Sequence, residues 1–272
     1  MRELLKSDLR RILKDKLFLV ACILGVIFAA ITPLTNKLLV VALDINGDTM
    51  SLSSFAQSKD MFFSAFSLGG NFGLLLPILI SIILCKDFSH GTVRNKIICG
   101  KSRSQIFLSS FFSGTIVICA AMLAHALITL IISLLFFPYQ ADPFTASSFL
   151  YLLISLLFSL LLYVFVSAII SALSVLMKNT GLAVVLFVAI NFLFTIIGTV
   201  TTVASIFIDP QDSTTVKIFE ILQKANPFLG AVIGRGTSYS LTDVLCILIP
   251  VVAGTALCIV LGLTVFKKKD LK

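Results

Sequence analysis

Residues 104–141, SQIFLSSFFSGTIVICAAMLAHALITLIISLLFFPYQA, contain no Asp, Glu, Lys or Arg, and this stretch decides the fold class. About 20 helical residues cross the hydrocarbon core of a bilayer, so the stretch is long enough to span a membrane. Around it the chain has further charge-free runs, at 17–36, 61–85, 143–177, 179–208 and 244–266. The runs do not alternate apolar and polar residues with a period of two, which excludes an outer-membrane barrel.

The runs predict an all-α polytopic integral membrane protein, because helices satisfy their own backbone hydrogen bonds in lipid. We expect six transmembrane helices in a single domain over residues 1–272. Their expected positions are 17–36, 64–85, 108–137, 148–176, 181–207 and 244–266.

The amino-acid composition also indicates a membrane protein. Of the 272 residues, 58% are apolar and 12% are charged, whereas soluble domains have about 25% charged residues. The mean hydropathy is +1.09. These values exclude a soluble enzyme, a nucleic-acid-binding protein and a disordered chain, because so little polar surface cannot cover a soluble fold.

The positive charges predict the topology. Sixteen of the 21 Lys and Arg residues lie in segments 1–16, 86–105, 177–180 and 267–272, on one side of the predicted spans. Because Lys and Arg accumulate in cytoplasmic loops, we expect both termini to be cytoplasmic. The six cysteines include no C-x-x-C pair and none lies in a predicted outer loop, so we expect neither a disulfide framework nor a metal site.

Segments outside the spans carry two further helical patterns. In residues 1–16, Leu5, Leu9, Ile12 and Leu13 share one helical face and basic residues occupy most of the other. This pattern is typical of an interfacial helix whose basic residues lie near anionic lipid headgroups. The outer loop 208–243 contains a second amphipathic stretch, at 213–224.

The sequence offers no catalytic motif. Gly100-Lys101-Ser102 resembles the end of a phosphate-binding loop, but the first glycine of that motif would fall on Asn95. We therefore expect no nucleotide hydrolysis by this chain and no enzyme activity. The charge-free runs contain no acidic residue and only His125 as a titratable imidazole, which disfavours an ion-coupled carrier.

Polar uncharged residues recur every three or four positions in the fourth and fifth predicted spans, so each set shares one helical face. Such stripes either line a weakly polar pathway or form helix–helix interfaces through hydrogen bonds. The candidate residues are Ser155, Ser159, Tyr163, Asn191, Thr195 and Thr199.

The loop 86–105 is the most informative segment. It contains Asp87, then Gly91-Thr92, a stretch of basic residues and Asn, and Gly100-Lys101-Ser102-Arg103 before the third span. Together with the six-span layout and the basic tail, this loop resembles type-2 ABC transporter permeases, in particular the bacterial bacitracin-export and peptide-antibiotic-immunity branch. That family often has Glu at the position of Asp87.

The resemblance implies that the loop is a coupling helix that docks on a separate cytoplasmic ABC ATPase subunit, which binds ATP and Mg. The implied contact residues are Asp87, Phe88, His90, Gly91, Thr92 and Arg94. It also implies a second permease copy, identical or homologous, and export of an amphipathic cargo (peptide, drug or lipid-like) across a bacterial cytoplasmic membrane. Two alternatives remain open: a membrane scaffold or assembly factor without transport, and a passive channel.

Overall fold

The computed structural model describes residues 1–45, 57–69, 71–89, 91–139, 146–177, 179–206, 213–226 and 241–268, and all regular structure in these ranges is helical. The helices are α1 (Arg2–Lys14), α2 (Lys16–Ile45), α3 (Ser58–Ser64), α4 (Asn71–Ser89), α5 (Thr92–Ile98), α6 (Arg103–Ser133), α7 (Ala146–Leu176), α8 (Thr180–Ile206), α9 (Ser213–Ala225) and α11 (Leu241–Lys268).

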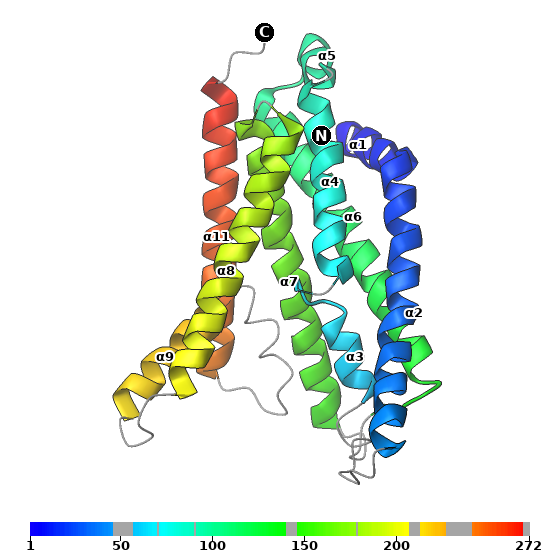
Figure 1. Cartoon of the computed structure of the whole chain (residues 1–272). Helices are drawn as coiled ribbons and strands as arrows, with labels where there is room; N and C mark the ends of the chain where they lie inside the picture. The colour runs from blue at the N-terminus through cyan, green and yellow to red at the C-terminus, as the bar shows by residue number, and fades with distance from the viewer. Residues whose placement is uncertain are drawn as a thin grey trace.

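The long helices run along one common direction and form a bundle (Figure 1). In the described part of the chain, α2, α6, α7, α8 and α11 are each long and apolar enough to cross a membrane, and α4 with α5 makes a sixth candidate if this bent pair is one span. The predicted all-helical membrane protein is therefore confirmed. The N-terminus and the C-terminal end of α11 lie at the same end of the bundle as α5, which we call the terminal end (Figure 1).

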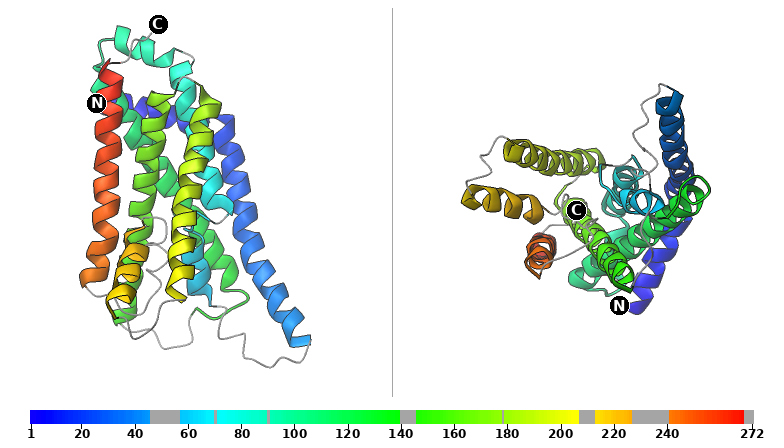
Figure 2. Two further views of the ribbon diagram at one scale, coloured as in Figure 1. Left: turned by 60° about the vertical axis from the view of Figure 1, so that its left-hand side comes forward. Right: turned by 90° about the horizontal axis from the view of Figure 1, so that it is seen from below.

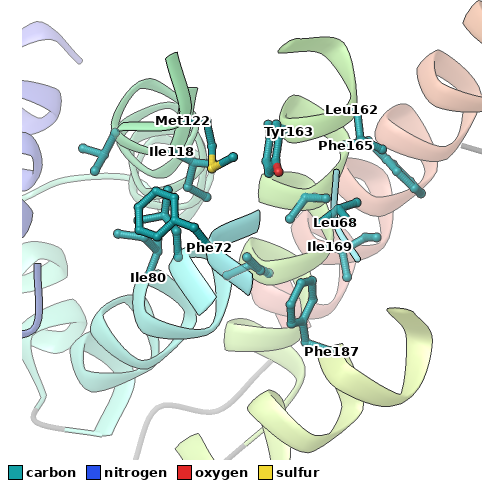
Figure 3. Close-up of a cluster of buried hydrophobic side chains, with 14 of the residues drawn as sticks. Leu68, Phe72, Ile80, Ile118, Met122, Leu162, Tyr163, Phe165, Ile169 and Phe187 are labelled. Carbon is teal, nitrogen blue, oxygen red and sulfur yellow. The ribbon is translucent and has the colours of Figure 1, made fainter. Parts of the chain in front are cut away.

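Helix α7 forms the centre of the bundle. In its most apolar window 61% of the residues are buried, compared with 11% in α11 and 22% in both α2 and α8. Around α7, side chains such as Phe72, Ile118 and Phe187 interdigitate in one apolar core (Figure 3). The outer faces of α2, α8 and α11 remain covered with exposed apolar side chains, as lipid-facing helices are.

The prediction of one uninterrupted helix over 64–85 is wrong. Helix α3 ends at Ser64 and α4 begins at Asn71, so a non-helical turn separates them. The tyrosine hydroxyl of Tyr163 on α7 donates a hydrogen bond of 3.0 Å to the carbonyl oxygen of Phe66 in this turn. Irregular backbone is tolerated at membrane depth where protein surrounds it, and Phe66 is fully buried.

Glycine makes the close approach at this turn possible. A Cβ atom on Gly73 would lie 2.1 Å from the carbonyl oxygen of Ser67 and 2.9 Å from the hydroxyl of Tyr163. No side chain fits in that space, so α4 can begin against the turn only with glycine at this position.

Helix α6 begins at Arg103, five residues earlier than its predicted span. Ser102 caps it, since its Oγ accepts a hydrogen bond from the Gln105 backbone N–H while the Gln105 side chain accepts one from the Ser102 N–H, both at 3.3 Å. This reciprocal pair is a capping box, which satisfies two N–H groups that the first turn leaves without partners.

The amphipathic stretch predicted at 213–224 is confirmed as a helix, α9, which packs on the far end of α8. Gln223 donates to the carbonyl oxygen of Thr201 at 3.1 Å, and Asn226 donates to that of Phe194 at 2.8 Å. Residues 208–212 and 227–240 of the predicted loop 208–243 lie outside the described residues, and its last three residues already belong to α11.

A helix occupies the N-terminal segment, but its buried face differs from the predicted apolar face. Leu4, Asp8 and Ile12 are buried against the bundle, whereas Leu13 is exposed. The reason is that α1 packs along α6, where a buried carboxylate finds partners. The stripe that includes Asp8 therefore faces protein.

Candidate functional site: a buried charge network at the terminal end

Helix α5 is a short, separately oriented helix at the terminal end. It is bent by 52° from α4 and begins directly after Gly91. Gly91 has φ 71° and ψ 9°, a left-handed conformation that residues with a Cβ rarely adopt. Thr92 then ties the two helices together, since its hydroxyl lies 3.0 Å from the backbone carbonyl oxygen of Asp87.

A network of charged side chains lies beneath α5. Asp87, at the end of α4, pairs with Arg11 of α1. Lys96 of α5 lies 2.6 Å from the carboxylate of Asp8 on α1 and 3.7 Å from that of Asp87. The hydroxyl of Ser109 on α6 donates a hydrogen bond of 2.6 Å to the second oxygen of Asp8. The network thus joins α1, α4, α5 and α6.

Burial makes this network sensitive to the loss of any member. Asp8 and Asp87 are each only 2% exposed. A buried charge without its partner costs about 3–5 kcal/mol, because neither water nor a counter-ion compensates it. Desolvation lowers the pKa of the Arg11 guanidinium, and Asp8 and Asp15 act in the opposite direction. Arginine nevertheless stays protonated in proteins, so the pair with Asp87 persists as an ion pair.

An apolar cluster supports α5 from the other side. Phe88 packs edge-on against Phe266 of α11, with ring centroids 5.7 Å apart, and Val93 of α5 is buried in the same cluster. The Arg103 guanidinium donates to the carbonyl oxygens of Phe266 and Lys267 at the end of α11, at 3.1 and 2.9 Å. Helix α5 is therefore held by charge toward α1 and by packing toward α11.

The outward side of α5 combines charge with one large apolar residue. Arg94 and Asn95 are exposed, and Ile98 at the last position of the helix is 75% exposed. A large apolar side chain with a basic rim is the composition of a contact surface for protein.

The residues predicted to contact an ATPase do not share one surface. Arg94 is exposed, while Phe88, Gly91 and Thr92 are half-buried. Asp87 points into the charge network and offers almost no surface. His90 lies outside the described residues.

The polar stripes of α7 and α8 lie in different environments. Ser155, Ser159 and Tyr163 of α7 are buried inside the chain. The Ser159 hydroxyl donates within its own helix, to the carbonyl oxygen of Ser155 at 2.8 Å. Tyr163 instead connects α7 to the turn before α4. In this part of α7 the stripe packs against neighbouring helices of the same chain.

The α8 stripe has a different environment. Asn191 is buried, whereas Thr195 and Thr199 are exposed on the outer surface of the bundle. Their hydroxyls donate within α8, to the carbonyl oxygens of Asn191 and Thr195, both at 3.0 Å. With their donors satisfied, these threonines present a mildly polar surface that lipid or a second protein can cover.

Sequence reasoning missed the network residues Asp8, Arg11, Lys96 and Ser109, and it missed Ile98. One signal was present: Asp8 falls on the same stripe as Leu4 and Ile12, four residues from each. A carboxylate on an apolar stripe requires a buried cation. In the described ranges no group of three or more His, Cys, Asp or Glu is placed to hold a metal ion.

Comparison with known proteins places the chain in a family. The model of a family described as "Protein of unknown function (DUF2705)" matches residues 17–272. The matched region includes α5 and the network residues of α4, α5 and α6, and it begins after α1. No curated protein matches the chain.

Proposed function

We propose that this chain, which belongs to the DUF2705 family of proteins of unknown function, is the membrane subunit of an ATP-driven exporter. In this proposal a separate ABC ATPase binds ATP and Mg and contacts α5. The terminal end is then cytoplasmic, as the distribution of Lys and Arg predicts, and the membrane is the bacterial cytoplasmic membrane.

The main support for the proposal is the way in which α5 is held on the bundle. A seven-residue helix at the end of a membrane bundle has little stability of its own. Here Gly91, Thr92, Lys96 and Val93 fix it on α4, α1 and the α11 cluster, while Ile98 and Arg94 stay exposed. A bound partner can displace such a helix as a rigid body, and the helix then transmits the displacement to the helices that hold it.

The charge network can transmit a displacement of α5 to other helices of the bundle. A displacement of α5 moves Lys96, which is paired with Asp8 on α1, and Asp8 in turn is bonded to Ser109 on α6. A partner that binds α5 differently with and without ATP would therefore bias two arrangements of α1 and α6 relative to α4, as a two-state mechanism requires. Asp87 has a positioning role in this proposal, and the partner contacts fall on Arg94 and Ile98.

The remaining surfaces fit an assembly of more than one chain. Exporters of this type need a second permease copy, identical or homologous, and the exposed Thr195 and Thr199 of α8 are candidates to face it or the cargo. Mildly polar hydroxyl surfaces suit an amphipathic peptide, drug or lipid-like cargo better than a bare ion.

Site-specific photo-crosslinking in cells tests the proposal. A photo-reactive phenylalanine analogue replaces Ile98, and the crosslinked protein is identified by mass spectrometry. The matched control places the same analogue at Ile218 on α9, an isoleucine that is 51% exposed at the opposite end of the bundle. We expect position 98, and not position 218, to crosslink a protein that has both nucleotide-binding motifs of ABC ATPases.

A second experiment tests the contribution of the Arg94 charge with the variant Arg94→Glu. Lys217→Glu on exposed α9 is its control. We expect Arg94→Glu to reduce crosslinking from position 98 and Lys217→Glu to leave it unchanged, because rim charges steer association. Crosslinks from position 98 only to proteins without nucleotide-binding motifs would contradict the exporter and favour a scaffold or assembly factor. The complete absence of a crosslink at position 98 would contradict α5 as a contact element.

A further inference from the structure

The exposed side of α1 carries a basic hollow. This open hollow of about 470 Å³ is lined by Glu3, Lys6, Ser7, Arg10, Arg11 and Lys14. Lys6, Arg10 and Lys14 lie four residues apart, so their side chains project from one side of the helix. In the described part of the chain these three cations take part in no ion pair. The hollow therefore has an excess of positive charge despite Glu3.

Arg11 connects the hollow to the charge network. One terminal nitrogen of its guanidinium pairs with Asp87. The other two nitrogens, Nε and Nη2, are buried and have no hydrogen-bond partner among the described residues. Arg11 also lines the hollow, so its positive charge adds to that of Lys6, Arg10 and Lys14, although its buried Nε and Nη2 atoms face away from a molecule in the hollow.

The position of the hollow indicates the source of that oxyanion. Helix α1 lies at the periphery of the bundle alongside α6 (Figure 2, right), and α2 follows it after Asp15. Immediately beyond the hollow α2 presents large apolar side chains, with Leu19 61% and Ile23 52% exposed. A cationic surface that continues into an apolar one matches a molecule with an anionic head and acyl chains. A soluble phosphate compound would contact only the cationic surface.

We propose that α1 forms a binding site for the phosphate headgroup of an anionic phospholipid. Lys6, Arg10 and Lys14 hold the headgroup in the hollow, the positive charge of Arg11 adds to the attraction, and the acyl chains lie against α2. Because Arg11 also holds Asp87 at the base of α5, the bound headgroup helps to fix the network. This site does not depend on export or on an ATPase.

Fluorescence quenching in nanodiscs tests the site. The chain contains no tryptophan, so Ser7→Trp introduces a single indole at the hollow. The full-length variant is reconstituted in phosphatidylcholine that contains an equal minor fraction of brominated phosphatidylglycerol or of brominated phosphatidylcholine. We expect stronger quenching by the brominated phosphatidylglycerol. Removal of each basic residue should reduce that preference about fivefold, which corresponds to about 1 kcal/mol per charge near an anionic surface.

Charge-matched variants decide whether the site is local. Lys6→Gln with Arg10→Gln removes two charges from the hollow, and Arg94→Gln with Lys101→Gln removes two from the α5 loop at the same end. Only the first pair should abolish the preference. An equal loss with both pairs would show an effect of net charge and overturn the site. If the first pair does not yield folded protein, Lys14→Gln alone should still give about the fivefold reduction.

Two further outcomes would overturn the lipid assignment. Equal quenching by the two brominated lipids would leave α1 as a surface for a protein. Loss of the preference in an excess of inorganic phosphate would assign the hollow to a soluble phosphate compound.

Discussion

The ammonium group of Lys96 lies 2.6 Å from the carboxylate of Asp8, a residue 88 positions earlier in the chain. The lysine side chain is 15% exposed and the aspartate 2%. Ser109 and Asp87 complete the surroundings of this pair. The contact joins the first helix of the chain to the loop helix α5, and it makes the position of α5 dependent on α1.

Breaking this pair should destabilise the protein. Lys96→Met removes the cation that is paired with the buried Asp8 carboxylate, and we expect a loss of up to about 3–5 kcal/mol. Asp8→Asn in the same chain should restore part of it, because no charge then remains unpaired at that position. The measurement is the melting temperature in detergent for both single variants and the double variant. Lys217→Met, on the exposed helix α9, serves as the control and should stay within about 0.5 kcal/mol of wild type. If the effects of Lys96→Met and Asp8→Asn on stability are strictly additive in the double variant, a direct interaction between the two residues is contradicted.

The turn between α3 and α4 gives a pair of glycine variants with opposite expectations. Gly73→Ala places a Cβ atom 2.1 Å from the carbonyl oxygen of Ser67, so the backbone must move, at a cost of about 3 kcal/mol or more. Gly69→Ala, four residues earlier, meets only the Ser67 hydroxyl at 3.7 Å and should be tolerated. Yield and monodispersity in size-exclusion chromatography compare them. Equal behaviour of the two variants would argue against the close packing of the turn.

The α7 stripe can be tested by removing two hydroxyls with different partners. Tyr163→Phe removes a bond between helices, and we expect a cost of about 0.6 kcal/mol and at most about 1.7 kcal/mol. Ser159→Ala removes a bond within α7, and we expect a smaller cost because the carbonyl oxygen of Ser155 is part of a regular helix. Thermal unfolding in detergent ranks the two variants. A larger effect of Ser159→Ala would indicate that this serine has a partner outside its own helix.

The native cysteines allow a test of sidedness without added residues. Cys99, at the end of α5, is exposed, whereas Cys22 is exposed on the apolar span α2 and Cys85 is buried. We expect a membrane-impermeant maleimide to label Cys99 in inside-out vesicles and not in intact cells. Cys99→Ser should remove the labelling of the vesicles and leave that of intact cells unchanged. Labelling of Cys99 from outside would place the terminal end on the outer side.

Most of the bundle follows from the positions of charges, because a helix interior in lipid excludes Lys, Arg, Asp and Glu strongly enough to mark each span. For this reason α11 begins and ends within three residues of the charge-free run 244–266, and α6 begins one residue before the run 104–141, although it ends earlier than that run, at Ser133. The non-helical turn at 65–69 has no such signal. It depends on Tyr163, which is almost a hundred residues away and whose side chain is fully buried.

The site was predictable in part. Glycine tolerates a left-handed backbone that other residues resist, and Gly91 does have a positive φ. The sequence also places Asp8 on an apolar stripe, which implies a cation, but several basic residues of the chain could supply it. Only the packing of α1 along α6 selects Lys96. The exposure of Ile98 likewise depends on how α5 is bent away from α4.

The contacts of α3 have a consequence for biogenesis. The Ser58 side chain donates to the carbonyl oxygen of Phe137, its backbone N–H donates to that of Pro138, and the following turn is bonded by Tyr163. All these partners leave the ribosome long after α3 itself. A seven-residue helix is also too short to cross the bilayer when it is synthesised. The α3–α4 segment is therefore translated early, but its contacts form only after α6 and the first half of α7 have been synthesised.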